Sequence, residues 1–248
     1  MLRNLNDDSV EQIKGGGFHF SATKLEHLLS DSYTLVDIVV DVSGSVYEFK
    51  DDLEKCVQKI VEACRKSPRA DNLLIRLTEF DDNVNEVHGY KLLQNCNTDE
   101  YIGIFNPTGM TALYDATCNA IEACLQYGKD LVNNSYSVNG IVFVLTDGMD
   151  NRSAHTETSV KEAIDKTRQQ ELLESITTIL IGIDTNNNNV NSYLKVFKED
   201  ADFNAYVEVQ EATPQRLARL AEFVSKSISS SSTSLGTGNV PQIQSLTI

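Results

Sequence analysis

Cysteine pairs are missing from this sequence. Its cysteines are odd in number and form no Cys-x-x-Cys pair: Cys56, Cys64, Cys96, Cys118 and Cys124. Free thiols in a protein interior behave as small apolar side chains. We therefore expect neither structural disulfides nor a cysteine zinc site, and we expect a reducing compartment, the cytoplasm.

Long apolar runs and an excess of basic side chains are missing as well. The longest apolar runs, 141–145 and 179–183, are far shorter than the ~20 residues of a membrane-spanning helix. Residues 1–8 contain no apolar segment typical of a secretory signal. With 36 acidic against 21 basic side chains the net charge is −15, whereas nucleic acids and anionic membranes attract basic surfaces. We therefore expect no nucleic-acid partner and no membrane partner.

Two patterns alternate along the 248 residues. Runs rich in β-branched residues predict strands, and apolar residues at three- and four-residue steps predict helices. The predicted strands are 34–40, 73–80, 84–92, 141–145, 176–183 and 205–209, and the predicted helices are 49–64, 113–127 and 217–228. Continuous apolar strands are typical of a parallel sheet, and the short turn 81–83 requires antiparallel neighbours. The sequence predicts an α/β fold: a doubly wound, mostly parallel central sheet with one antiparallel hairpin strand and helices on both faces.

The two ends differ from this central part. Residues 1–31 contain a triple glycine and a short helical pattern at 22–29, and we interpret them as an N-terminal arm that packs on the domain. Residues 32–229 form the predicted domain. Residues 230–248 are rich in serine and glycine and bury too little apolar surface to be ordered, so they are predicted to be a flexible tail.

Three polar loops adjoin the predicted strands and helices. Residues 41–45 follow the first strand, residues 146–150 follow the strand 141–145, and residues 107–115 lead into the helix 113–127. Ligands of open α/β sheets bind at the carboxyl ends of the strands, so we expect the three loops to meet there. The candidate metal ligands in these loops are Asp41, Ser43, Ser45, Thr111 and Asp147.

These five side chains all offer oxygen, which suits a hard cation such as Mg²⁺, with Mn²⁺ or Ca²⁺ as alternatives, better than zinc. Asp41 and Asp147 can bind directly or through water. Because the other three donors are neutral, the ion would stay under-neutralised and would attract an external carboxylate. The expected output is ligand capture and not bond breaking.

Simpler roles exist for the same residues. Asp41, Ser43 or Ser45 could each cap the following helix, and Thr111 could cap the helix that it precedes. Thr108 competes with Thr111 as a ligand, and we prefer Thr111, which directly precedes Ala-Leu. The acidic pair 81–82 reads as a solvated hairpin tip, and the four histidines read as residues of the surface or the arm.

The three loops together resemble a known family. Asp41-x-Ser43-x-Ser45, the Thr111 of Gly-Met-Thr-Ala-Leu and Thr146-Asp147-Gly148 are similar to the metal-ion-dependent adhesion site of von Willebrand factor A-type domains. The resemblance covers residues 32–229 and implies a doubly wound sheet, a divalent ion at its top and a protein partner that donates an Asp or Glu carboxylate. Met110 stands where many relatives have a second glycine.

The lack of a secretion signal makes the chain resemble the intracellular, bacterial or phage branch of that family. Members of that branch often act as adaptors for AAA+ ATPases, or in metal-insertion and stress-response assemblies. The resemblance therefore implies a non-enzymatic, Mg²⁺-dependent protein-binding module.

The alternative is a Mg²⁺-dependent phosphatase or phosphotransferase, with Asp41 as nucleophile and Asp147 holding the ion. Haloacid-dehalogenase-like phosphatases place Asp-x-Asp after their first strand, and Ser43 replaces the second acid here, so the general acid is absent. No Gly-x-Ser-x-Gly sequence supports a serine hydrolase. We therefore expect that the protein is not an enzyme.

Overall fold

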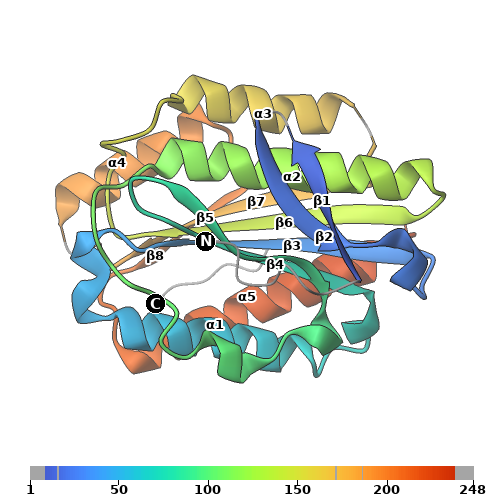
Figure 1. Ribbon diagram of the computed structural model, residues 1–248. Helices are drawn as coiled ribbons and strands as arrows, with labels where there is room; N and C mark the ends of the chain where they lie inside the picture. Colours follow the sequence, from blue (N-terminus) through green and yellow to red (C-terminus); the bar gives the residue numbers. More distant parts are fainter. Residues whose placement is uncertain (1–8, 16, 171, 186, 238–248) are drawn as a thin grey trace.

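An eight-stranded sheet runs through the middle of the protein, and helices cover both of its faces (Figure 1). The computed structural model describes residues 9–15, 17–170, 172–185 and 187–237. The strands are β1 (Val10–Gly15), β2 (Phe18–Thr23), β3 (Ser32–Asp41), β4 (Leu73–Phe80), β5 (Val84–Leu92), β6 (Ser137–Thr146), β7 (Ile176–Ile183) and β8 (Ala205–Val209). The α-helices are α1 (Lys50–Cys64), α2 (Leu113–Asn133), α3 (Glu157–Gln169), α4 (Asn188–Asp200) and α5 (Pro214–Ser234).

The strand order is β1-β2-β5-β4-β3-β6-β7-β8. β3 pairs in parallel with β4 on one side and with β6 on the other, and β7 and β8 continue the parallel part. β4 and β5 form the antiparallel hairpin expected from the turn between them. The predicted fold class is therefore confirmed. Because the chain leaves β3 toward β4 and later returns beside it as β6, the carboxyl end of β3 is a point where the strand order reverses.

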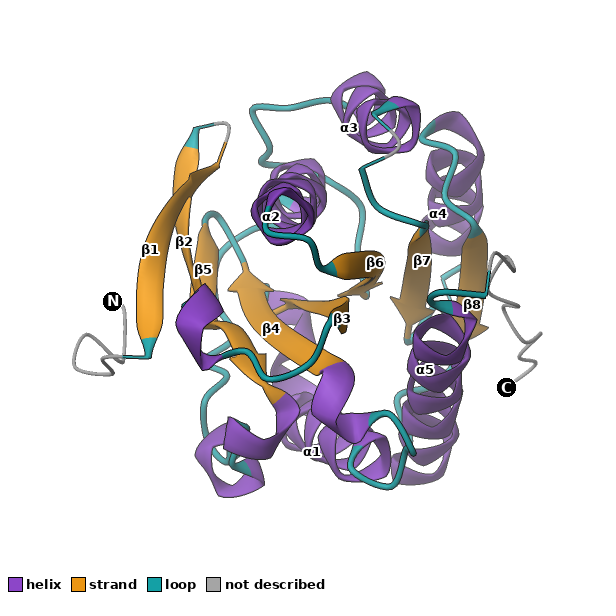
Figure 2. Cartoon of the chain, turned by 90° about the vertical axis from the view of Figure 1, so that its right-hand side faces the viewer, coloured by secondary structure: helices purple, strands orange, loops and turns teal. Residues whose placement is uncertain are grey.

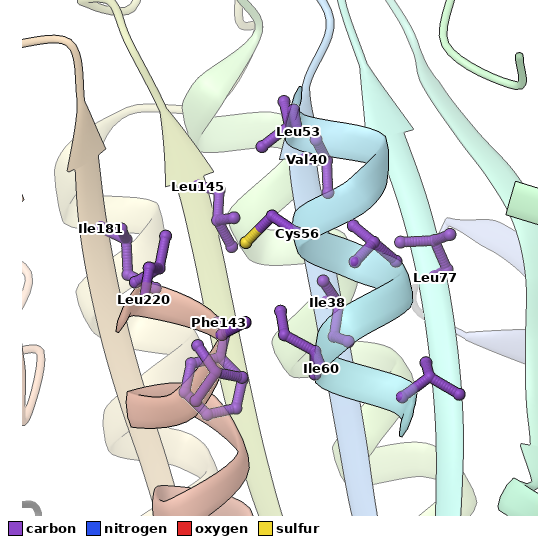
Figure 3. Close-up of a cluster of buried hydrophobic side chains, with 14 of the residues drawn as sticks. Ile38, Val40, Leu53, Cys56, Ile60, Leu77, Phe143, Leu145, Ile181 and Leu220 are labelled. Carbon is purple, nitrogen blue, oxygen red and sulfur yellow. The ribbon is translucent and has the colours of Figure 1, made fainter. Parts of the chain in front are cut away.

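The hydrophobic core lies in two layers, one on each face of the sheet. Alternate residues of β3 point to opposite faces, so Ile38 and Val40 belong to the layer under α1 and α5. Leu35 and Val39 belong to the layer that α2, α3 and α4 cover. Figure 3 shows the first layer, in which Cys56 of α1 packs among aliphatic side chains. Burial on both faces explains why the central strands are nearly continuous apolar runs.

The N-terminal segment, predicted to be an arm that packs on the domain, contributes two strands to the edge of the sheet. β1 and β2 form a second antiparallel hairpin, and β2 lies beside β5 at the edge of the sheet (Figure 2). The helical pattern predicted at 22–29 is wrong, because the structure has only a 3₁₀ turn, Leu25–His27, there. Phe18, Phe20 and Ala22 alternate with polar residues, and this period of two is the strand signal that the helical interpretation missed.

A buried ionic network ties this hairpin to the sheet. Arg76 of β4 is 1% exposed. It donates to Asp37 Oδ1 (3.2 Å) in β3, to Glu86 Oε2 (2.9 Å) in β5 and to Asn119 Oδ1 (2.9 Å) in α2. The other oxygen of Glu86 accepts the backbone N–H of Ser21 in β2 at 2.9 Å. The network therefore joins four strands and one helix.

Gly89 of β5 allows β2 to approach closely, which gives a first prediction. A Cβ atom at position 89 would lie 1.8 Å from the carbonyl oxygen of Ser21, so Gly89→Ala must push the hairpin outward. We expect a loss of about 2 kcal/mol in the free energy of unfolding, as for an overpacked site. Urea denaturation measures this loss, and hydrogen exchange should show faster exchange in β2. Gly17→Ala, in the turn of the same hairpin, meets no atom within 4 Å and should change stability by less than about 0.5 kcal/mol.

The C-terminal helix is longer than predicted. Thr213 caps it by accepting the N–H of Arg216 (3.4 Å), as its Thr-Pro start indicates, but the helix continues through the serine run to Ser234. Ser231 and Ser232 are buried, and the Asn139 side chain donates to the Ser231 carbonyl at 2.6 Å. The predicted flexible tail at 230–248 is thus helical to residue 234, because packing on β6 orders the serines. Residues 238–248 lie outside the described residues.

None of the helices in the described part of the chain combines the length and the apolar character that a membrane span requires.

Candidate metal centre

The three predicted loops meet at the carboxyl edge of the sheet. β3 ends at Asp41 and the adjacent β6 ends at Thr146, so the loops that follow these strands start side by side. The third loop, which precedes α2, is held against the first by two backbone bonds. Thr108 N–H donates to the Val42 carbonyl at 3.0 Å, and Gly44 N–H donates to the Gly109 carbonyl at 3.3 Å.

Three of the five candidate ligands are joined by direct side-chain contacts. The Oγ atoms of Ser43 and Ser45 are 3.2 Å apart, and Ser45 Oγ donates to Asp147 Oδ1 at 3.0 Å. The hydroxyl of Thr111 lies near the loop of Asp147, because a Cβ atom built on Gly148 would be 3.5 Å from Thr111 Oγ1. The contacts therefore join donors of two loops, and the third loop places Thr111 beside them.

The side chain of Asp41 lies beside Ser43 and is buried, with 1% of the residue exposed. Its Oδ1 accepts the N–H of Ser43 at 2.8 Å, and its Oδ2 accepts the hydroxyl of Thr146 at 2.6 Å. Thr146 was not among the predicted site residues, although it belongs to the Thr-Asp-Gly sequence. Its hydroxyl fixes the orientation of the Asp41 carboxylate.

The spacing of the donors fits a small divalent cation. Adjacent ligands of an octahedral Mg²⁺ site, each at 2.0–2.1 Å from the ion, are about 3.0 Å apart. The contacts between Ser43 and Ser45 (3.2 Å) and between Ser45 and Asp147 (3.0 Å) have this spacing. The described residues contain no group of three or more His, Cys, Asp or Glu side chains arranged to hold a metal. The predicted donor set contains only two carboxylates, and its other three members are hydroxyl groups, a composition that suits a hard cation.

Ionisation of the two carboxyl groups of the site is unfavourable without a cation. Burial, together with the nearby charge of Asp147, raises the pKa of Asp41 from its ordinary value of 3.8 to about 7, against the lowering effect of the bonds from Thr146 and Ser43. Burial also raises the pKa of Asp147, and the charge of Asp184 adds to this. A bound cation would stabilise both ionised forms.

The β4–β5 turn supports the Thr111 loop, a role that the sequence interpretation missed. The carbonyl of Asp81 accepts the N–H that follows Thr111 (2.8 Å), and the carboxylate of Asp82 accepts the N–H of Met110 (3.3 Å). Thr111 N–H also donates to Asn151 Oδ1 at 2.8 Å. The acidic turn therefore holds the loop that carries Thr111 and is not a free hairpin tip.

The simpler capping roles fit the geometry less well. Ala112, not Thr111, is the N-cap of α2. Ser43 stands at the N-cap of the 3₁₀ helix Gly44–Glu48, and its side chain makes no capping bond. Thr108 is exposed and Thr111 is 5% exposed, so only Thr111 lies within the buried part of the loop.

Histidines with described bonds lie apart from these donors. His88 is buried, contrary to the expected surface position, and its Nε2 is 2.9 Å from the hydroxyl of Tyr101. Burial lowers the pKa of His88 to about 3, so it is neutral. His155 pairs with Asp115 at 2.7 Å.

The fold is shared with solved structures of proteins that differ widely in sequence. The PilB minor pilin from Streptococcus sanguinis is 15% identical over 88% of this chain and 66% of its own, with a TM-score of 0.59. The pilus adhesin SpaC from Lactobacillus rhamnosus GG is 11% identical over 81% of this chain and 31% of its own, with a TM-score of 0.57. Proximal thread matrix protein 1 from the mussel byssus is 16% identical over 81% of this chain and 46% of its own, with a TM-score of 0.55.

At these identities the likeness concerns the fold alone, and the chain spans less than two thirds of each of these proteins. No family model matches the chain, and no curated protein matches it in sequence.

Proposed function

We propose that the protein is a non-enzymatic, Mg²⁺-dependent protein-binding module that captures an Asp or Glu carboxylate of its partner. The observation that supports this proposal is the contact between oxygen donors of two loops, with Ser43, Ser45 and Asp147 at the spacing of adjacent Mg²⁺ ligands. The resemblance of these loops to the adhesion site of von Willebrand factor A-type domains agrees with it. The fold that the chain shares with a pilus adhesin also agrees with the proposal.

Each donor has a distinct part in this proposal. Mg²⁺ would supply a concentrated positive charge and a coordination position open to a carboxylate oxygen. Ser43, Ser45 and Thr111 hold the ion through neutral hydroxyl groups, so they do not offset its charge. Asp147 and the buried Asp41 supply the negative charge that retains the ion when no partner is bound.

The position of Asp41 argues against the phosphatase alternative. A nucleophilic carboxylate needs a free oxygen directed at the substrate. Both oxygens of Asp41 accept hydrogen bonds, one from Ser43 N–H and one from the Thr146 hydroxyl. His88 is buried, neutral and bonded to Tyr101, so it is not placed to act as a general acid or base here.

We also propose a reducing compartment, the cytoplasm. All five cysteines are free and buried. Burial raises the pKa of the Cys56, Cys64 and Cys118 thiols to about 12, so these groups act as apolar packing and not as thiolates. An adaptor role in an AAA+ ATPase or stress-response assembly rests on the family resemblance alone.

The matched pair Thr111→Ala and Thr108→Ala tests the ligand assignment. Loss of a buried hydroxyl that binds the ion should weaken Mg²⁺ binding at least about tenfold, the effect of 1.4 kcal/mol. Thr108 is exposed and lies on the same loop, so its substitution should leave the affinity unchanged. Isothermal titration calorimetry measures the Mg²⁺ affinity of both variants. Equal affinities for the two variants would contradict the assignment of Thr111.

The binding function itself is tested by pull-down with Mg²⁺ and with EDTA. Partners retained by the wild type in Mg²⁺ should be released by EDTA and should not be retained by Thr111→Ala. Retention that EDTA leaves undiminished would exclude a role of the ion in recognition. Hydrolysis of a phosphate ester that Asp41→Asn removes would instead establish the enzymatic alternative.

A further inference from the structure

We infer that the metal site is surrounded by an apolar rim, formed by Tyr47, Met110 and Met149, and that its partner is a protein segment in which apolar side chains flank the captured carboxylate. This inference rests on the proposed function and adds the class of partner. The rim side chains are 67%, 50% and 42% exposed, respectively.

The rim residues occur in the three loops that carry the candidate ligands. Tyr47 is two residues after Ser45, Met110 directly precedes Thr111, and Met149 is two residues after Asp147. The other large apolar side chains that the described residues expose to a comparable degree are Leu29, Ile102 and Val196. None of these belongs to the three loops. Single exposed apolar residues are ordinary, whereas three around one polar site form a patch.

The exposure of the donors places the open side of the site beside this rim. Asp41, Ser43 and Thr111 are 1%, 2% and 5% exposed, whereas Ser45 is exposed and Asp147 is half-buried. A carboxylate that reaches the ion must therefore enter beside Ser45 and Asp147, each two residues from a rim side chain. The residues on either side of that carboxylate in the partner chain then come to rest against Tyr47 or the two methionines. Apolar flanking residues gain burial there, and charged ones lose hydration without a partner.

The charges around the site restrict the occupant further. Asp41 and Asp147 share the site and Asp184 acts on Asp147, whereas Asp82, beside the backbone of Met110, pairs with Arg152 at 3.2 Å. Without a cation the carboxylates of Asp41 and Asp147 repel an acidic segment, and a divalent cation offsets their charge. A partner therefore needs both features: the carboxylate to bind the ion and the apolar flanks to bind the rim. The Asp82 bond also fixes the Met110 backbone, so the rim is positioned before binding.

Methionine methyl groups give a direct readout, because the chain contains three methionines and two of them are in the rim. We would record carbon-13 methyl spectra of the full chain in saturating Mg²⁺, with Met110→Leu and Met149→Leu to assign the signals. The probes are acetyl-Leu-Asp-Leu-amide, acetyl-Gly-Asp-Gly-amide and acetyl-Leu-Asn-Leu-amide. We expect the first to shift both rim signals and to bind about tenfold more tightly than either of the others. EDTA should abolish these shifts.

Tyr47→Ser keeps both methionine signals and should reduce the preference for the leucine-flanked peptide, whereas Val196→Ser, an exposed apolar residue on α4, should not. Equal binding of the leucine- and glycine-flanked aspartate peptides would overturn the rim and leave the proposed function intact. Equal binding of the asparagine peptide, or binding in EDTA, would show an apolar patch that needs no carboxylate and would also overturn the inference. The inference would also be overturned if none of the three peptides shifts the methionine signals while calorimetry shows that Mg²⁺ is bound. If calorimetry shows no Mg²⁺ binding, the proposed function fails and the inference fails with it.

Discussion

Substitution of Asp41 by asparagine should remove the response of the protein to Mg²⁺ without unfolding it. At a Mg²⁺ concentration about 100-fold above the dissociation constant, a site present only in the folded state adds about 2.7 kcal/mol to the free energy of unfolding. For a chain of this size that is a rise in melting temperature on the order of 5–10 °C. Asp41→Asn takes away one of two carboxylates, so this rise should disappear. Differential scanning calorimetry with and without Mg²⁺ measures it.

The same variant should be at least as stable as the wild type in EDTA. The substituted side chain carries no charge, and its amide can still accept the Ser43 N–H and contact the Thr146 hydroxyl. Burial raises the pKa of Asp41 from 3.8 to about 7, so the folded protein binds a proton between these pH values that the unfolded chain releases. Stability of the metal-free wild type therefore falls as pH rises from 4 to 7, on the order of 1 kcal/mol per pH unit. The part of this fall that comes from Asp41 should be absent in Asp41→Asn, which keeps the fall that the raised pKa values of Asp37 and Asp147 produce.

Asp150→Asn is the matched control for the loss of one negative charge. Asp150 lies in the same loop after β6, but its carboxylate accepts hydrogen bonds from the Tyr114 N–H and the Ser153 hydroxyl and contacts none of the candidate metal ligands. Its response to Mg²⁺ should equal that of the wild type. A Mg²⁺-induced rise in the melting temperature of Asp41→Asn that matches the wild type would remove Asp41 from the site. A wild type that shows no rise would contradict the metal centre as a whole.

The central strands could be predicted because their signal is local. β4, β7 and β8 begin and end at the predicted residues, since each is a β-branched run between polar turns. The N-terminal hairpin could not be predicted in the same way. Its place depends on contacts that are distant along the chain, such as the Thr23 hydroxyl on the Tyr90 carbonyl (2.9 Å) and the Tyr127 hydroxyl on the Thr23 carbonyl (2.6 Å).

The end of α5 shows the opposite error. Composition predicts a flexible segment, but Ser231 and Ser232 lie against β6 on the buried side of a helix that begins with a strong apolar face. Serine is small and only moderately unfavourable in helices, so packing decides. Composition alone therefore predicts flexibility correctly only for a serine-rich segment that does not pack against the sheet.

The convergence of the three loops could also be predicted, from the rule that the carboxyl ends of parallel strands meet at one edge. The supporting contacts could not. Asn151 holds Thr111, and the acidic turn between β4 and β5 holds the loop before α2, yet neither belongs to a recognisable sequence pattern. Whether the five donors bind an ion stays a prediction, which the experiments on Thr111 and Asp41 address.

Replacement of the buried Arg76 by methionine should cost about 3–5 kcal/mol of stability at pH 7.5, because two buried carboxylates lose their cation. These are Asp37 and Glu86, which accept its hydrogen bonds at 3.2 Å and 2.9 Å. Urea denaturation measures the loss. Arg168→Met is the control: Arg168 pairs with Asp202 at the surface, so its loss should cost less than about 1 kcal/mol.

The cost of Arg76→Met should depend on pH in a defined direction. Burial already raises the pKa of Asp37 from 3.8 to about 6, against the lowering effect of Arg76, so removing the arginine raises this pKa further. The folded variant then holds a proton over a wider range than the wild type, and its stability falls more steeply as pH rises from 4. The difference between wild type and variant should therefore be smallest near pH 4 to 5 and largest above pH 7. A difference that stays constant over this range, or a cost no larger than that of Arg168→Met, would show that Arg76 does not neutralise the two carboxylates. In that case the N-terminal hairpin would be held by the bonds of Glu86 with Ser21 and of Thr23 with Tyr90, without a contribution from Arg76.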